Sequence, residues 1–345
     1  MSGSNVIDVH MESVPDINGV QQWLRKGSLI LGDASGAALD FSNLRFTFDV
    51  HRAVVAAPNY ALIRIYNVNS TTAQKVIKEF SQVVLKAGYE GNEAEIFKGQ
   101  VVYTVRGNNA GELVEGPQHA AIFSNRESPT DTFLEITAAD GSSAYNFGRG
   151  NVSLAAGTGF EDTINSLAPE LKKYNVTIGA IPFDSEVKWP LTPRAQTFSG
   201  SLRSVLDEIC NTINAKWSIQ LGALEIVLNT QFLPGPAVVV GPRTGMIGQP
   251  RQTINDGVEF TCLLNPYIRM NRLIKLDPQA IQQVAPPVAY GILDTTQEID
   301  PKGEYRAVKI VHSGDTRGNN WYTYVTAIPK TSPGRSPSQP SNQVN

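Results

Sequence analysis

The stretch that decides the fold is Leu44-Arg-Phe-Thr-Phe-Asp-Val50, in which apolar and polar side chains alternate without a break. Because successive side chains of a β-strand point to opposite faces, this alternation predicts a strand with one face in a core and one in solvent. Working outward, related patterns predict further strands at 60–68, 83–89, 94–105, 119–124 and 132–139. Residues 107–111, Gly-Asn-Asn-Ala-Gly, are predicted to form a hairpin or loop tip.

One short helix interrupts these strands. Ser70 is placed to cap its N-terminus, and the apolar stripe of the helix is predicted to be Ala73, Val76, Ile77 and Phe80. Five or six short strands with a single helix predict a β-barrel or a sandwich for residues 29–153.

The pattern changes to a helical period between residues 154 and 232. Thr158 and Glu161 have the spacing of a capping box, and the stripe that follows is Phe160, Ile164 and Leu167, before Pro169. A strand is predicted at 174–181. A second helix is predicted from Leu202, Val205, Leu206, Ile209 and Ile213, leading into a hairpin of 216–221 and 224–228. Two successive helix–strand units predict a separate α/β module.

Strand patterns return after the linker Pro234-Gly-Pro236, at 258–264, 273–276, 306–312 and 321–328. Residues 278–304 are rich in Pro and Gln and are predicted to be a loop. The predicted class is mainly β (α+β), with two β domains separated by a small α/β module. The predicted divisions are an N-terminal extension at 1–28, domains at 29–153, 154–232 and 233–330, and a disordered Pro/Ser tail at 331–345.

Composition narrows the classes of protein that this chain can be. Its 345 residues are 41% hydrophobic and 18% charged, which predicts two or three domains with real cores. The 29 basic residues against 32 acidic ones leave a charge of −3, which argues against wrapping nucleic acid. No apolar run is long enough for a membrane helix, and the first residues do not resemble a signal peptide. Cys210 and Cys262 occupy apolar positions, and we expect both to be core thiols of a protein made in a reducing cytoplasm.

Motifs that carry chemistry are missing. The dipeptide Gly-Lys of a phosphate loop and the Gly-x-Ser-x-Gly elbow do not occur, and Gly148-Arg-Gly150 and Gly157-Thr-Gly159 lack the context of a dinucleotide fingerprint. None of the four histidines has metal-ligand spacing, and each is predicted to be structural; they are His10, His51, His119 and His312. We therefore predict no catalytic, cofactor-binding or metal-binding residues and no cofactor.

The richest polar stretch is His312-Ser-Gly-Asp-Thr-Arg-Gly-Asn-Asn-Trp-Tyr-Thr323. His312, Asp315 and Arg317 could form an active-site loop. The favoured interpretation is a connection between two strands, with Gly314 and Gly318 supplying turn geometry. The aromatic residues nearby, Trp321, Tyr322 and Tyr324, are interpreted as β packing rather than as a platform for bases.

The ordered set of segments resembles the baseplate hub proteins of tailed bacteriophages. The resemblance covers most of residues 40–330 and is carried by Tyr60 to Ser70, Val84 to Gly91, Ile96 to Gln100, Asp131 to Gly141 with Tyr145-Asn146, Thr244 to Pro250, Val258 to Arg269, and Tyr305 to Val325. One departure is that the second β region has no clear counterpart of the helix at 70–82. This departure leaves open that chain segments cross between the domains.

The resemblance implies two tail-tube-like β-barrel domains in each chain and a homotrimeric ring. Such a ring adapts the sixfold tail tube to the threefold central spike, and its lumen carries the tape measure and then DNA in transit. The implied partners are further copies of the chain, the central spike protein, the tail tube or tube-initiator protein, the tape measure protein and other baseplate proteins, with no membrane. The implied location is the baseplate of the virion tail, assembled in the host bacterial cytoplasm, and subunit contacts should bury more than about 2,000 Å².

Two other functions stay open from the sequence. One is a cell-wall glycosidase or peptidase acting during penetration, for which Asp315 and Glu161 are the carboxylates to test. The other is a tail protein that binds a host receptor or a sugar. The absence of a catalytic constellation favours the structural hub over the enzyme.

Overall fold

The computed structural model describes residues 22–33, 36–108, 132–181, 193–229, 231–253, 257–282 and 299–329. The predicted strand at 119–124, His10, His119, most of the predicted loop at 278–304 and the predicted Pro/Ser tail lie outside these residues. So do most of the N-terminal extension and the loop tip beyond Asn108.

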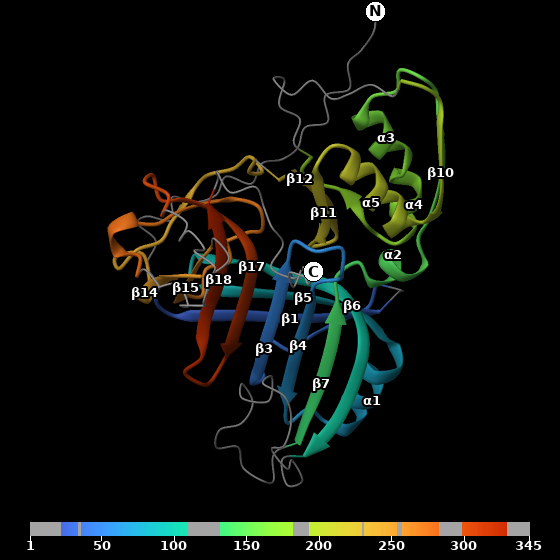
Figure 1. The fold of residues 1–345 in the computed structure, drawn as a ribbon. Helices are drawn as coiled ribbons and strands as arrows, with labels where there is room; N and C mark the ends of the chain where they lie inside the picture. Colours follow the sequence, from blue (N-terminus) through green and yellow to red (C-terminus); the bar gives the residue numbers. More distant parts are fainter. Residues whose placement is uncertain are drawn as a thin grey trace, which may run out of the picture.

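One 13-stranded sheet dominates the molecule. In Figure 1 the orange and red strands from the end of the chain lie beside the blue strands from its beginning. The strands of this sheet are β1 (Arg25–Asp33), β2 (Ala38–Asp40), β3 (Phe46–Ala53), β4 (Tyr60–Tyr66), β5 (Phe80–Tyr89), β6 (Asn92–Asn108), β7 (Thr132–Ala139), β13 (Val238–Val239), β14 (Met246–Gln252), β15 (Val258–Leu263), β16 (Leu273–Lys275), β17 (Glu304–Asp315) and β18 (Trp321–Pro329).

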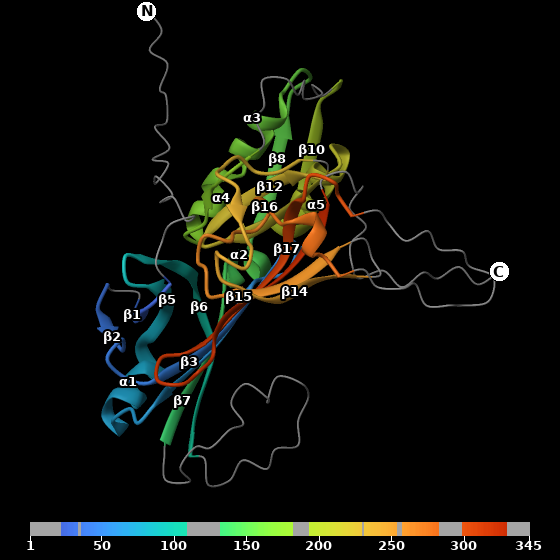
Figure 2. The ribbon, with the colours of Figure 1, turned by 90° about the vertical axis from the view of Figure 1, so that its left-hand side faces the viewer.

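The prediction of a mainly β chain is confirmed, but the described strands do not form two separate closed barrels. Their main path is open and runs β14-β15-β18-β17-β3-β4-β7-β6-β5-β1-β2. The physical reason lies in β17, which pairs with β16 at Glu304–Arg306 and with β3 from Lys309 to Asp315. The second β region would need this edge of β17 to close into a barrel. The edge pairs with β3 of the first β region instead, as Figure 2 shows.

The two β regions repeat the same strand order. The first region runs β3-β4-β7-β6-β5 and the second β14-β15-β18-β17-β16, which is the order 1-2-5-4-3 along the chain in both cases. The fourth strand is bulged at the same step: the pairing shifts between Val101 and Tyr103 in β6 and between Ala307 and Lys309 in β17. A shared order with a matching bulge indicates an internal structural repeat.

The helix α1 (Ser70–Glu79) lies between the second and third strands of the first repeat. Its predicted apolar stripe packs on the sheet through the buried Ala73 and Val76. Asn69, not Ser70, is the N-cap, because its side chain accepts a hydrogen bond from the backbone N–H of Thr71. In the second repeat, residues 264–272 join β15 to β16 through turns without a helix, as the sequence predicts.

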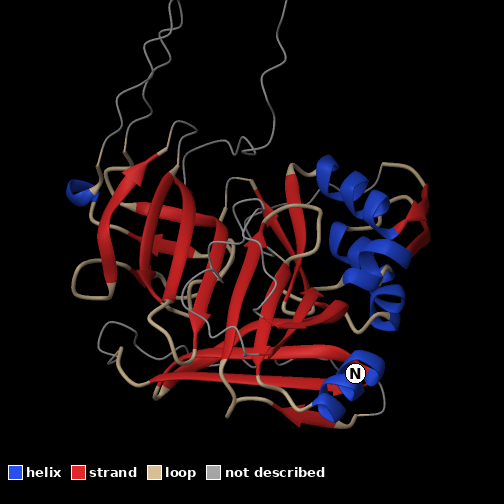
Figure 3. Ribbon diagram, turned by 90° about the horizontal axis from the view of Figure 1, so that it is seen from below, coloured by secondary structure: helices blue, strands red, loops and turns tan. Residues whose placement is uncertain are grey.

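The remaining helices belong to one α/β module, which begins at Ser142, before the predicted boundary at 154, and Figure 3 shows them gathered on one side of the molecule. Helix α5 is its centre: Ser201 caps it by accepting a hydrogen bond from the backbone N–H of Ser204, and the predicted residues Leu202, Val205, Leu206 and Ile209 are buried. The elements are α2 (Ser142–Phe147), β8 (Arg149–Leu154), α3 (Phe160–Ser166), α4 (Ala168–Lys173), β9 (Thr177–Ile178), β10 (Gln196–Ser201), α5 (Leu202–Thr212), β11 (Ala215–Gln220) and β12 (Ala223–Leu228), with the 3-10 turn Pro278–Ala280 outside the module.

The predicted capping box at Thr158 and Glu161 is wrong. Gly159 is the N-cap of α3, with no hydrogen bond from a side chain, and the Thr158 hydroxyl donates instead to the carbonyl of Ala155. The Thr158 side chain thus bonds to the preceding turn and does not cap the helix.

Three hydrophobic cores lie under these elements. The first belongs to the first repeat with Leu264 and Trp321 added, the second to the module, and the third to the second repeat. Cys210 lies in the second core and Cys262 in the third, and both are free thiols. Burial raises the pKa of each thiol to about 12, so the prediction of core thiols is confirmed.

Candidate assembly surface

The side of the large sheet that faces away from the three cores, from β14 to β6, is called the outer face. It is partly exposed over the second repeat, but Thr47, Asp49 and Arg64 at its centre are buried, so the predicted solvent face of residues 44–50 is wrong. Along β18, Trp321, Thr323 and Val325 are buried toward the cores, whereas Tyr322, Tyr324 and Thr326 point to the other side. Tyr324 is 43% exposed. The alternation that predicts the strands thus assigns every second side chain to this face.

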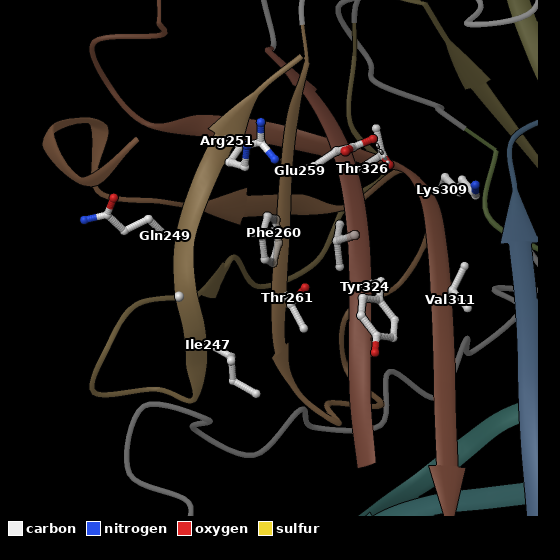
Figure 4. Close-up of a pocket in the computed structure, with 12 residues that line it drawn as sticks. Ile247, Gln249, Arg251, Glu259, Phe260, Thr261, Lys309, Val311, Tyr324 and Thr326 are labelled. Atoms are coloured by element: carbon white, nitrogen blue, oxygen red, sulfur yellow. Dashed lines mark hydrogen bonds between the residues drawn. The ribbon is translucent and has the colours of Figure 1, made fainter. Parts of the chain in front are cut away.

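A groove of about 370 Å³ crosses the outer face of the second repeat. Arg251 lies directly opposite Glu259 in the register of β14 and β15, and the Thr326 hydroxyl donates to a Glu259 carboxylate oxygen at 3.4 Å. Figure 4 shows the lining side chains on four neighbouring strands, among them Ile247, Gln249, Arg251, Glu259, Thr261, Lys309, Val311, Tyr324 and Thr326. The lining mixes apolar, neutral polar and oppositely charged groups.

At the centre of the outer face, where β3 meets β17, the side chains of His51 and Asp49 are hydrogen-bonded. The distance from His51 Nε2 to an Asp49 carboxylate oxygen is 2.7 Å, and Asp49 lies opposite Ser313 in the register of the two strands. The imidazole stacks on the ring of Tyr60 at a centroid distance of 4.6 Å. Burial and the Asp49 charge raise the pKa of Tyr60. His51 thus lies inside β3 rather than just after it, with its ring held between Asp49 and Tyr60.

The interpretation of 312–323 as a strand connection is confirmed. His312 is fully buried in β17, where Nδ1 lies 3.0 Å from the Thr323 hydroxyl. Burial, assisted by the charge of Arg52, lowers the pKa of His312 to about 3, so this imidazole is neutral and has no access to a substrate.

Asp315, at the end of β17, pairs with Arg45 at 2.9 Å and accepts a hydrogen bond from the backbone N–H of Arg317. Burial alone would raise the pKa of Asp315, but these hydrogen bonds and the charge of Arg45 hold it below its usual value. Glu161, the other candidate carboxylate, lies in the first turn of α3, an element of the module. The structure does not bring these two carboxylates together in one site.

Trp321 is a packing residue, as the sequence predicts. It is fully buried, its ring lies edge-on to Phe48 at 5.4 Å, and its indole N–H donates to the carbonyl of Gly88 at 3.1 Å. The hydrogen bond fastens the β17–β18 hairpin to β5, so the second repeat supplies part of the first core.

The outer face ends in two strand edges. Among the described residues, Asn92–Gln100 of β6 pair with β5, but from Val101 onward β6 pairs only with β7. Two of the most exposed apolar side chains of the described chain lie at this edge, Val102 at 58% and Tyr103 at 63%. At the other end, the outer edge of β14 pairs, as far as the structure describes the chain, through one isolated bridge between Arg251 and Gln282. The sequence alone did not identify these edges.

In the part of the chain that the structure describes, no three or more His, Cys, Asp or Glu side chains gather as metal ligands. Within the same residues, every helix is too short or too polar to cross a bilayer.

The sequence matches no family model and no curated protein. The structure resembles the 43 kDa tail protein of prophage MuSo2 from Shewanella oneidensis, with a TM-score of 0.52 at 8% identity, over 89% of this chain and 97% of that one. It also resembles a tail protein from Neisseria meningitidis, with a TM-score of 0.51 at 9% identity, over 88% of this chain and 96% of that one. The chain thus has the fold of phage tail proteins, as its resemblance to baseplate hubs predicts.

Proposed function

We propose that this chain is a structural baseplate hub of a phage tail, without enzymatic activity. In this proposal three copies form a ring that adapts the sixfold tail tube to the threefold central spike. Its fold, shared with two tail proteins over nearly the whole chain, supports a role in a tail.

The observation that carries the proposal is the repeated strand order. Each chain contains two β regions with the order 1-2-5-4-3 and a matching bulge in the fourth strand. Three such chains present six similar units around one axis, so the same ring can meet a sixfold and a threefold partner. In this proposal the two units belong to tube-like domains at 29–153 and 233–330, with the α/β module at 154–232 between them.

The outer face of the sheet is the proposed wall of the channel. Several of its charges lie beside opposite or neutral partners: Arg251 is opposite Glu259, and Arg64 pairs with Glu135 at 2.8 Å. Unpaired basic groups would bind DNA phosphates by releasing counterions, whereas paired charges attract them less. Such a wall suits the passage of the tape measure and then of DNA.

The remaining partners follow from the position of a hub. The ring would contact the central spike protein on one side and the tail tube or a tube-initiator protein on the other, with other baseplate proteins around it. The chain would then be located in the virion tail, after assembly in the host cytoplasm.

The experiment is to purify the full chain and measure its mass by mass photometry, then to average electron micrographs viewed along the axis. A trimer with a hollow, six-lobed outline is expected. A strict monomer at micromolar concentration that also ignores the spike protein would contradict the proposal.

Two assays separate the rival functions. Clearing of peptidoglycan in a zymogram, lost in Asp315→Ala or Glu161→Ala, would establish the cell-wall enzyme instead. Specific binding of the isolated chain to host cells would establish the receptor-binding protein. Clearing is not expected, because Asp315 is bound to Arg45 at the end of β17, whereas Glu161 lies in α3, which packs in the second core.

A further inference from the structure

The junction between the two repeats inside one chain shows how one unit joins the next. β17, the fourth strand of the second repeat, leaves β16 after Arg306, passes its bulge and pairs antiparallel with β3, the first strand of the first repeat. Seven residue pairs form this junction, from Lys309 opposite Ala53 to Asp315 opposite Thr47. One long strand thereby belongs to two units.

β6 has the same form, but within the described ranges no second strand pairs with it beyond its bulge. Its first half pairs with β5, it is bulged between Val101 and Tyr103, and beyond the bulge its outer edge is unpaired among the described residues. Val102 and Tyr103 are well exposed at that edge. An exposed apolar strand edge is a template for pairing with another chain, and natural edges are usually blocked by Lys, Pro or a covering segment.

The complementary edge belongs to β14, because β14 is the first strand of the second repeat, as β3 is of the first. Within the described part of one chain β6 and β14 do not pair with each other, and six strands lie between them in the sheet order. A second copy can supply this pairing. This inference rests on the proposed function, in which copies form a ring.

We propose that β6 beyond its bulge pairs antiparallel with β14 of a second copy, in the register of the internal β17–β3 junction. This contact is head-to-tail, so repeating it around an axis closes a ring without leaving free sheet edges on the channel wall.

The register follows from strand pairs that the repeats share. Matched at the bulge and through their partners in β7 and β18, Arg106 corresponds to His312. Matched through β4 and β15, Gln252 corresponds to Val50. Because His312 lies opposite Val50 in the internal junction, Arg106 should lie opposite Gln252 of the second copy.

Gln282 holds the edge of β14 before closure. Its backbone N–H donates to the carbonyl of Pro250 at 2.8 Å, and its carbonyl accepts from the backbone N–H of Gln252 at 3.0 Å. These are the β14 groups that an incoming strand needs. The ring contact therefore displaces Gln282, which protects the edge in the single chain.

The test is an engineered disulfide across the proposed pair, since opposing Cα atoms of antiparallel strands lie within disulfide range. Under mild oxidation, the full chain with Arg106→Cys and Gln252→Cys should shift on a non-reducing gel from monomer to covalent trimer. An equal mixture of the two single variants should stop at dimers, because each chain then has one new thiol. Each single variant alone should stay monomeric on the gel, because the contact is head-to-tail. The native thiols are buried, and the unmodified chain gives the background.

Two controls complete the test. Thr104→Cys with Gln252→Cys shifts the pair by two residues on the same face and should cross-link far less. Gln282→Pro, which removes the N–H that holds Pro250, should speed cross-linking of the matched pair. If mass photometry shows trimers but the matched pair does not cross-link, this contact is wrong while the proposed hub function stands. Equal cross-linking of the shifted pair would have the same meaning. A chain that is only monomeric would overturn both proposals.

Discussion

The Asp140 carboxylate accepts a hydrogen bond from the backbone N–H of Gly222 at 3.0 Å, although 82 residues separate them. Asp140 follows β7, and Gly222 lies in the tight turn between β11 and β12, where Leu221 and Gly222 both have positive φ. Asn59 donates to the carbonyl of Ile219 at 2.8 Å, and Arg52 donates to the Gln220 side chain at 2.9 Å. The tip of the module's hairpin is thus clamped to the first β region by buried polar groups.

This clamp should make stability depend on pH. Burial raises the pKa of Asp140 from 3.8 to about 7, against the hydrogen bonds from Gly222 and Leu221 and the charge of Arg52. A folded pKa above the unfolded one means that the stabilisation is complete below about pH 4 and is lost as the pH rises through about 7. The side chain of Asp140→Asn stays neutral, so this variant should not lose stability in this way. Between pH 4 and 8, its unfolding free energy relative to that of the unmodified chain should therefore rise by up to about 4 kcal/mol.

Urea unfolding of both proteins at several pH values measures this gain. Asp140→Ala is the control, because it also removes the charge but leaves the N–H of Gly222 without its acceptor, at a cost of about 1–3 kcal/mol relative to Asn. A difference between the Asn variant and the unmodified chain that stays constant with pH would rule out this role of Asp140.

Trp321 should be one of the most sensitive positions for stability. Trp321→Phe leaves the carbonyl of Gly88 without its donor and opens space beside Phe48, which should lower the unfolding free energy by about 2–4 kcal/mol. Tyr324→Phe, on the exposed side of the same strand, should change it by less than about 0.5 kcal/mol. Chemical denaturation of the two variants gives the comparison, and equal effects would refute the assignment of Trp321 as a packing residue.

The exposed edge of β6 should control assembly and not folding. The double variant Val102→Lys/Tyr103→Lys places charges on an edge that has no partner strand in the described part of the chain, so its melting temperature should stay close to that of the unmodified chain while the proposed trimers dissociate. Ile77→Lys changes a half-exposed residue of α1 and should keep the trimer. Mass photometry at matched concentrations decides, and a stable trimer of the double variant would exclude this edge from the contact.

Both cysteine thiols should be unreactive in the folded protein. Burial raises the pKa of Cys210 and Cys262 to about 12, so neither forms the thiolate that attacks a disulfide reagent. A colorimetric thiol assay should detect no rapid reaction under native conditions and two thiols per chain in denaturant. Fast labelling of either residue in the native protein would contradict its burial.

Local pattern was enough for many elements of this fold, although the strands β1, β8, β10 and β14 were not predicted. The alternation from Leu44 to Val50 predicted β3 and its buried face, and the helical stripe from Leu202 to Ile209 predicted α5 and its core contacts. Both follow from periodicity, because the spacing of apolar side chains defines which face can be buried. The predicted helix caps were wrong by one residue: the N-caps are Asn69 and Gly159 instead of Ser70 and Thr158. Neighbouring polar groups compete for the same backbone partners, so sequence alone does not choose between them.

The sequence could not predict which strands form the outer face of the sheet or where its edges lie. The sequence determined two mainly β regions, an α/β module between them and the absence of familiar catalytic motifs. Only the tertiary structure decided that β17 pairs with β3, that among the described strands none pairs with the outer edges of β14 and of β6 beyond its bulge, and that Asp140 meets Gly222. The reason is that a strand's pattern fixes its faces but not its neighbours, which depend on backbone hydrogen bonds that every sequence can make.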